Sequence, residues 1–160
     1  MGAATRAAFA AAAVLLAGCA AGGAGPSMHA MHMAQAAPDT RAAVRFPQAL
    51  REHTLANMRD HLATLERIQD ALARSAYDEA SSLAERRLGL SSLEAHGAHE
   101  VAPFMPPGMQ EAGTAMHKAA SRFAIEATNA GATGDAKPAM AALARLTAQC
   151  VACHAAYRLE

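Results

Sequence analysis

The chain has 160 residues, of which 52% are hydrophobic and 18% charged, which describes one globular domain and excludes a mainly disordered protein. Its 14 basic and 14 acidic residues cancel and are scattered along the sequence, so no basic patch indicates a nucleic-acid partner. Aromatic residues make up only 4%, whereas alanine is abundant and methionine occurs nine times. This composition favours close-packed helices over strands.

Residues 1–18 carry the features of a lipoprotein signal peptide. Arg6 is the one charge ahead of an apolar run, and this run is too short and too rich in alanine to span a membrane comfortably. The stretch LAGC, which ends at Cys19, resembles the lipobox of bacterial lipoproteins. The resemblance implies cleavage before Cys19, lipid on its sulfur and anchoring at the periplasmic membrane surface. An uncleaved transmembrane anchor and a soluble export signal with a chance cysteine are the alternatives.

Residues 19–45 are predicted to form a flexible tether, because Gly, Ala, Pro and Ser predominate and no apolar period is sustained. The tether contains the segment MHAMHM, whose thioethers and imidazoles suit copper, especially Cu(I). The alternative is a coil in which these side chains bind nothing, since a ligand-rich coil must still become ordered around an ion. The candidate copper ligands are Met28, His29, Met31, His32 and Met33.

Residues 46–160 are predicted to fold as an all-α, antiparallel four-helix bundle. The first helix begins near Pro47 and places apolar residues three and four apart, with a gap at Gln69. The second begins after Tyr77 with Asp78 as its N-cap and ends at the sequence GLSS. The glycines of NAGATGD close the third helix, and the fourth follows them. The apolar stripes are Leu55, Met58, Leu62, Leu65 and Leu72; Leu83 and Leu88; Met109, Ala112, Met116, Ala119 and Phe123; and Leu143, Leu146, Cys150, Cys153 and Tyr157.

No strand pattern competes with these helices. Short connections favour the antiparallel bundle, in which cofactor sites are built from side chains of facing helices. The fourth stripe turns both Cys150 and Cys153 toward the predicted core.

The sequence CVACH, residues 150–154, is the attachment signature of c-type haem. In this signature two thiols form thioethers with the haem vinyl groups, and the adjacent imidazole binds the iron on its proximal side. A thioredoxin-like pair would need a βαβ context, a zinc site would need further ligands, and a disulfide within one helical turn has poor geometry. We therefore expect one covalent haem c, held by Cys150, Cys153 and His154.

The region from about residue 46 to the end resembles the cytochrome c-prime family. The features that carry the resemblance are the CxxCH near the C-terminus followed by AAYR, GD sixteen residues before the first haem cysteine, YDEA at the start of the second helix, and Arg158 four residues after His154. The resemblance implies a haem-binding four-helix bundle in which Arg158 lies near the haem. Taken alone, Arg158 is equally explained as a charge that complements the C-terminal end of the helix dipole.

The same resemblance places a residue of the first helix over the other face of the iron. The family has a methionine there when the haem is six-coordinate and an apolar lid when it is five-coordinate. Aligning Arg51 with an arginine that often precedes the lid puts Leu55 over the iron, whereas aligning MRDH with a Met-Lys-Asp pattern puts Met58 there. Residues three apart share a helix face, so periodicity does not choose. Met58 is the predicted ligand, because a flexible thioether within reach of an open iron site should coordinate it; core packing is its alternative role.

Two further sets of side chains are candidates for metal binding. His96 and His99 are three residues apart and could face one ion, although solvated surface histidines are commoner. Met105, Met109 and Met116 are expected to fill the core rather than bind metal.

Together these features predict a monohaem c-type cytochrome that transfers single electrons at the periplasmic membrane surface. Its redox partner is not identified by the sequence, and a homodimer is compatible with it. The alternatives are a five-coordinate haem protein that binds nitric oxide or another small gas, and a lipoprotein that captures copper through the tether. The motifs GxSxG, the phosphate loop and HExxH are absent from the sequence, so we do not expect an enzyme.

Overall fold

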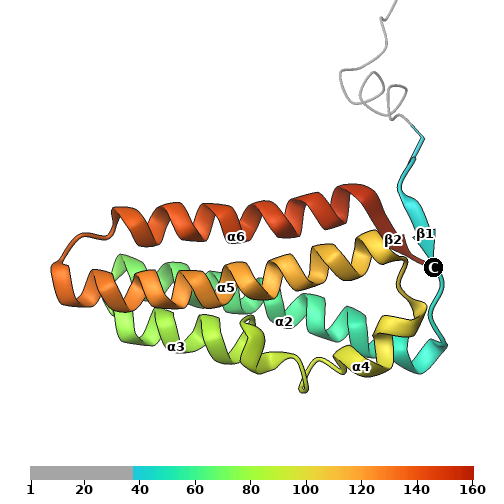
Figure 1. The fold of residues 1–160 in the computed structure, drawn as a ribbon, viewed down its shortest axis with the longest axis horizontal. Helices are drawn as coiled ribbons and strands as arrows, with labels where there is room; N and C mark the ends of the chain where they lie inside the picture. Colours follow the sequence, from blue (N-terminus) through green and yellow to red (C-terminus); the bar gives the residue numbers. More distant parts are fainter. Residues whose placement is uncertain (1–37) are drawn as a thin grey trace, which may run out of the picture. The chain divides into compact units, whose positions relative to one another are not determined.

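The computed structural model describes residues 38–160 (Figure 1). The predicted signal peptide, Cys19 and the Met/His segment at 28–33 lie outside the described residues. The compact unit Asp39–Glu160 is all-α apart from two short strands, which confirms the predicted helical bundle. Its helices are α2 (Gln48–Ala73), α3 (Tyr77–Arg87), α4 (Ala98–Val101), α5 (Pro107–Thr133) and α6 (Lys137–Ala156), with the 3₁₀ turns η1 (Leu90–Ser92) and η2 (Ala102–Phe104) between α3 and α5.

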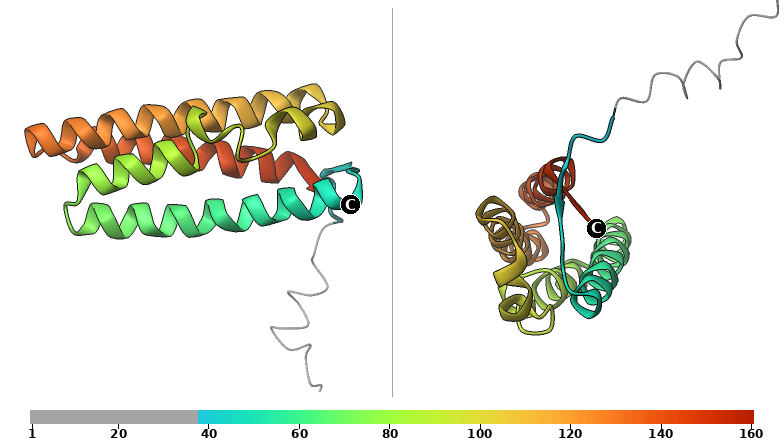
Figure 2. Two further views of the ribbon diagram at one scale, coloured as in Figure 1. Left: turned by 90° about the horizontal axis from the view of Figure 1, so that it is seen from below. Right: turned by 90° about the vertical axis from the view of Figure 1, so that its right-hand side faces the viewer.

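The four long helices pack in the order in which they occur along the chain. α3 packs on α2, α5 packs on α3 and α6 packs on α5, and each runs antiparallel to the long helix before it (Figure 1). α2 and α6, the first and last of the four, make hardly any close backbone contact with each other. The end-on view in Figure 2 shows β1 crossing between these two helices. The bundle is therefore least tightly packed along its α2–α6 side.

Proline and glycine mark helix ends as the sequence indicates. Pro47 directly precedes α2, and Gly134 ends α5 with a φ of 75°, a left-handed conformation that glycine adopts without a steric penalty. The prediction that Asp78 caps the second helix is wrong, because α3 already begins at Tyr77. Asp78 lies in the first turn, where its charge complements the helix dipole.

Two short strands correct the expectation that the chain has none. β1 (Ala42–Val44) and β2 (Tyr157–Leu159) pair in parallel, with Val44 opposite Leu159. The predicted fourth helix ran one residue too far, because α6 ends just before β2. The strands form because Val44 and Leu159 pack with Phe46 in one apolar cluster at this end of the bundle. β1 lies in a segment that the sequence assigns to the tether.

The main core consists mostly of alanine and leucine side chains from all four long helices. Small side chains allow the helices to approach closely, and Phe123 is the largest side chain that is fully buried. Met109 and Met116 are buried as predicted, and Met105 is partly buried.

The buried apolar side chains form two clusters, which we name after their position. The central cluster includes Ile68, Leu83, Leu88, Phe123 and Leu146, and the end cluster includes Val44, Phe46, Val101 and Met109.

The buried face of α2 differs from the predicted one. Leu62, at the middle of the predicted stripe, is 71% exposed, and Leu55 and Met58 are only partly buried. The buried face is displaced from the predicted stripe by one residue, or about 100° around the helix. It consists of Thr54, His61, Thr64, Ile68 and Ala71.

Candidate cofactor site between α2 and α6

Cys150, Cys153 and His154 occupy the last two turns of α6, at the boundary between core and surface. Cys150 packs against the central cluster and Cys153 against the end cluster. His154 is exposed, and its backbone carbonyl oxygen accepts a hydrogen bond from the Arg41 guanidinium at 3.3 Å. The three side chains of the CxxCH motif are thus held on one rigid helix end, next to the β1–β2 pair.

Both thiols are free and lie in an apolar environment. Burial raises the pKa of Cys150, and burial together with the neighbouring Cys150 raises the pKa of Cys153. The Cys150 thiol donates to the carbonyl oxygen of Leu146 at 3.7 Å. Such thiols are protonated at neutral pH, whereas a thiol–disulfide redox pair requires a cysteine with a lowered pKa. The environment therefore disfavours thioredoxin-like chemistry.

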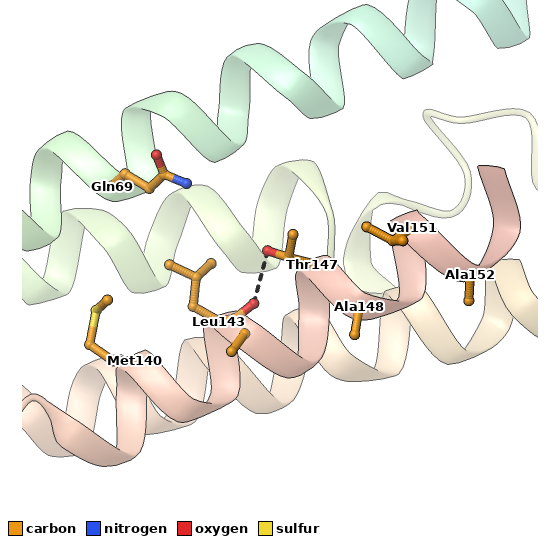
Figure 3. Close-up of a pocket in the computed structure, with 8 residues that line it drawn as sticks. Gln69, Met140, Leu143, Thr147, Ala148, Val151 and Ala152 are labelled. Atoms are coloured by element: carbon orange, nitrogen blue, oxygen red, sulfur yellow. Dashed lines mark hydrogen bonds between the residues drawn. The ribbon is translucent and has the colours of Figure 1, made fainter. Parts of the chain in front are cut away.

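An open groove of about 650 Å³ runs along α6 as far as Val151 and Ala152, the two residues between the motif cysteines (Figure 3). Its floor is formed by α6, including Leu143, Thr147 and Val151, and Gln69 lines it from α2. The Thr147 hydroxyl donates to the Leu143 carbonyl oxygen at 3.0 Å, so the groove offers an almost wholly apolar surface. Its volume lies within the range of small-molecule sites.

The apolar stripe of α2 continues the α2 side of this groove. Gln69 lines the groove, and Leu62 lies two helical turns before it, on the same face. Leu62 is therefore exposed on the open side of the bundle, whereas the face with Thr54 and His61 packs toward the core. Of the stripe, Leu62 alone is exposed, because Leu65 and Leu72 pack against the central cluster. An exposed leucine beside an apolar groove is expected where a large apolar group covers both.

Counting residues along the two helices puts Met58 and His154 at about the same level. Gln69 of α2 faces Leu143 of α6 across the groove (Figure 3). Met58 is eleven residues before Gln69, and His154 is eleven residues after Leu143. Eleven residues make three turns and about 16 Å, and because the helices are antiparallel both steps go the same way. Leu55, one turn from Met58, shares its helix face.

Unpartnered polar atoms occur near the ends of α2 and α6. The Nε atoms of Arg51 and Arg158 and the hydroxyl of Thr54 are buried without a hydrogen-bond partner among residues 38–160. Arg158 Nε lies 3.8 Å from an Asp39 carboxylate oxygen, too far for a hydrogen bond. The other end of the Arg158 guanidinium pairs with the Glu160 carboxylate at 3.0 Å, so among the described residues Nε is its one buried nitrogen without a partner. A buried N–H without an acceptor is costly, and an anionic carboxylate is the partner that a guanidinium prefers.

Of His96 and His99, for which solvated surface positions were the favoured prediction and a shared ion the alternative, only His99 lies on the surface. His99 is exposed, and His96 instead contacts His61 of α2 and His117 of α5. Sequence analysis missed His61 and His117, because they are 35 and 21 residues away from His96 in the chain. One feature of the sequence does indicate that His61 is buried. His61 lies seven residues before the apolar Ile68 and so shares its helix face, and Ile68 is buried.

The sequence matches no protein-family model, and neither a curated protein nor a solved structure is significantly similar to it. Within residues 38–160, no helix is both long enough and apolar enough to cross a membrane.

Proposed function

We propose that the chain is a monohaem c-type cytochrome that transfers single electrons, with its haem bound between α2 and α6. The observation that carries this proposal is the CxxCH motif on α6, whose two middle residues, Val151 and Ala152, line the end of an apolar groove on the open side of the bundle. Cys150 and Cys153 would hold the haem covalently, and His154 would bind its iron. The cytochrome c-prime resemblance supports the same assignment.

The residues around the groove fit the chemistry of a haem. The exposed Leu62 of α2 and the floor of the groove suit a flat apolar macrocycle. The haem also carries carboxylates, for which the buried and unpartnered Nε atoms of Arg51 and Arg158 are suitable donors. Free, protonated thiols at Cys150 and Cys153 are available for thioether formation.

When bound, the haem supplies an iron that changes its oxidation state by one electron. The protein sets the potential through the axial ligands and through burial. Met58 is the proposed second ligand, because it is level with His154 on the facing helix, and a thioether ligand raises the reduction potential. Apolar side chains on both sides of the groove would keep water from the site.

A five-coordinate protein that binds nitric oxide or another small gas is the second candidate. It is favoured by the position of Leu55, which is partly buried on the same face of α2 as Met58. As an apolar lid, Leu55 would leave the iron open to a small ligand. The spin state of the oxidised protein distinguishes the two functions, because methionine ligation gives a low-spin iron.

We further propose that the protein acts at the periplasmic membrane surface as a lipoprotein anchored through Cys19. The support is the LAGC sequence after a short apolar run. Cells that express the full chain with labelled palmitate should label the protein, and Cys19→Ala should abolish the label. Absence of label in the unaltered chain would contradict the anchor without affecting the haem proposal.

The experiment that tests the haem proposal is expression of the full chain in a bacterium with a c-type maturation system, followed by extraction with acidified butanone. Haem should remain with the protein after extraction, and Cys150→Ala with Cys153→Ala together should remove it. A haem that extracts fully from the unaltered protein would show that the thiols do not carry it.

A further inference from the structure

We propose that His61, His96 and His117 form a binding site for a divalent transition metal such as Zn²⁺, separate from the CxxCH motif. The Nε2 atoms of His61 and His96 face each other at 3.4 Å. The ring centroids of His96 and His117 are 5.4 Å apart. His61 and His117 are more than nine-tenths buried, so three imidazoles meet inside the protein where α2, α5 and the α3–α5 connection come together.

The hydrogen bonds around His96 fix its proton on Nδ1. The Ser92 hydroxyl is buried and donates to the Gly89 carbonyl oxygen at 2.7 Å. Because the Ser92 hydroxyl proton is used in this bond, Ser92 Oγ can only accept a hydrogen bond from His96 Nδ1, which lies 3.4 Å away. In the neutral ring the lone pair is then on Nε2, the atom that faces His61. Metal-binding histidines usually donate their other ring nitrogen to a neighbour in this way.

His117 is held in the same form by the main chain. Its Nδ1 lies 2.8 Å from the Leu88 carbonyl oxygen, which can only accept, so Nδ1 carries the proton and Nε2 carries the lone pair. Asn57 of α2 holds the α3–α5 connection, which carries His96, in place. Its side-chain amide donates a hydrogen bond to the His96 backbone carbonyl oxygen at 3.1 Å. The positions of the protons on His96 and His117 are thus set by neighbouring groups before any ion binds.

The spacing of the two facing nitrogens suits a metal. At zinc–nitrogen distances of about 2.0–2.1 Å, two ligands of a tetrahedral site are about 3.3 Å apart. Within residues 38–160 no three His, Cys, Asp or Glu side chains already have the spacing of a complete metal site. His61 and His96 are therefore the preformed part, and a side-chain rotation of His117 together with water completes the coordination.

One proton lies between the two facing nitrogens. Because His96 carries its proton on Nδ1, the proton in the contact between the Nε2 atoms belongs to His61. On zinc binding, the His61 proton moves from Nε2 to Nδ1. The ring stays neutral, and both facing Nε2 atoms then present lone pairs to the ion.

The test is a calorimetric titration of the full chain with Zn²⁺, with the thiols either in thioethers or alkylated so that the outcome is independent of the haem proposal. We expect one bound zinc, with affinity lowered at least tenfold by His61→Gln and by His96→Gln. Ser92→Ala should also lower the affinity, because it releases the His96 ring. The matched control is His99→Gln, which changes an exposed histidine three residues from His96 and should leave the affinity unchanged.

Failure of the unaltered chain to bind zinc would overturn the proposal. So would binding that is lost in His29→Ala with His32→Ala but kept in His96→Gln, which would assign the ion to the N-terminal segment. For variants that do not fold, the imidazole nitrogen resonances of the unaltered chain provide the answer. One equivalent of Zn²⁺ should shift those of His61 and His96 and not that of His99, and unshifted His61 and His96 resonances would contradict the site.

Discussion

Cys150 and Cys153 lie one turn apart on α6 and pack against different parts of the protein, the first against the central cluster and the second against the end cluster. A group attached to both sulfurs is therefore fixed to both parts at once. The end cluster also includes Val44 of β1 and Leu159 of β2 as contacts. Haem attachment should consequently stabilise the β1–β2 pair as well as the helical bundle.

The central cluster depends on its one large aromatic side chain. Phe123 is fully buried, so Phe123→Ala should lower the free energy of unfolding by about 3–5 kcal/mol through lost burial and the cavity left behind. The control is Phe104→Ala, since Phe104 is 42% exposed and should cost less than about 1 kcal/mol. Denaturant unfolding of the two variants measures both values. Equal costs would show that the core is not centred on Phe123.

The exposed Leu62 of α2 should become buried when haem is bound. Leu62→Asp should then lower the free energy of unfolding of the haem-loaded protein by about 1.5–3 kcal/mol, the cost of losing a buried leucine. Ile125→Asp is the matched control, because Ile125 is also an exposed aliphatic residue within a long helix, 58% against 71% for Leu62. Thermal unfolding of the two haem-loaded variants compares them. Similar losses in both would place the haem elsewhere.

The identity of the second axial ligand determines the spin state. If Met58 binds the iron, the oxidised protein is low-spin and shows a weak sulfur-to-iron charge-transfer band. Met58→Ala should convert it to high-spin and open the reduced iron to carbon monoxide, whereas Leu55→Ala should leave it low-spin. A native oxidised protein that is already high-spin would make Leu55 the lid, and gas binding would become the preferred function.

The positions of the helices and of the CxxCH motif could be predicted from the sequence because both are local. Three- and four-residue spacing specifies a helix over many residues, and residues such as Pro47 and Gly134 mark its ends. The motif needs only the spacing of Cys150, Cys153 and His154. These features do not depend on which distant segments pack together.

The face that α2 buries could not be predicted in this way. Leu62, at the middle of its most apolar stripe, is exposed, Leu65 and Leu72 are only partly buried, and the face with Thr54 and His61 packs toward the core. Periodicity assigns the most apolar face to the core, but it cannot distinguish a protein core from a cofactor surface. If the chain binds haem as proposed, the predicted and the observed buried faces of α2 differ because Leu62 and its neighbours on the apolar face contact the haem.

Contacts between segments that are far apart in the chain could not be predicted from the sequence either. β1 and β2 are three-residue strands separated by more than a hundred residues, and their pairing depends on packing in the end cluster rather than on a local strand pattern. The contact of His61 with His96 joins α2 to the α3–α5 connection, which a search for closely spaced ligands does not find. The proximity of His96 and His99 in the chain left only a solvated position or a shared ion to consider for His96, and neither describes its contact with His61.

The most direct test of the haem proposal is the mass of the denatured, mature chain after expression with c-type maturation. We expect the mass to exceed that of the polypeptide, together with any lipid, by one haem, and the excess to disappear when Cys150 and Cys153 are both changed to alanine. A chain that carries no haem mass, while a known c-type cytochrome expressed in parallel does, would show that the protein is not a c-type cytochrome.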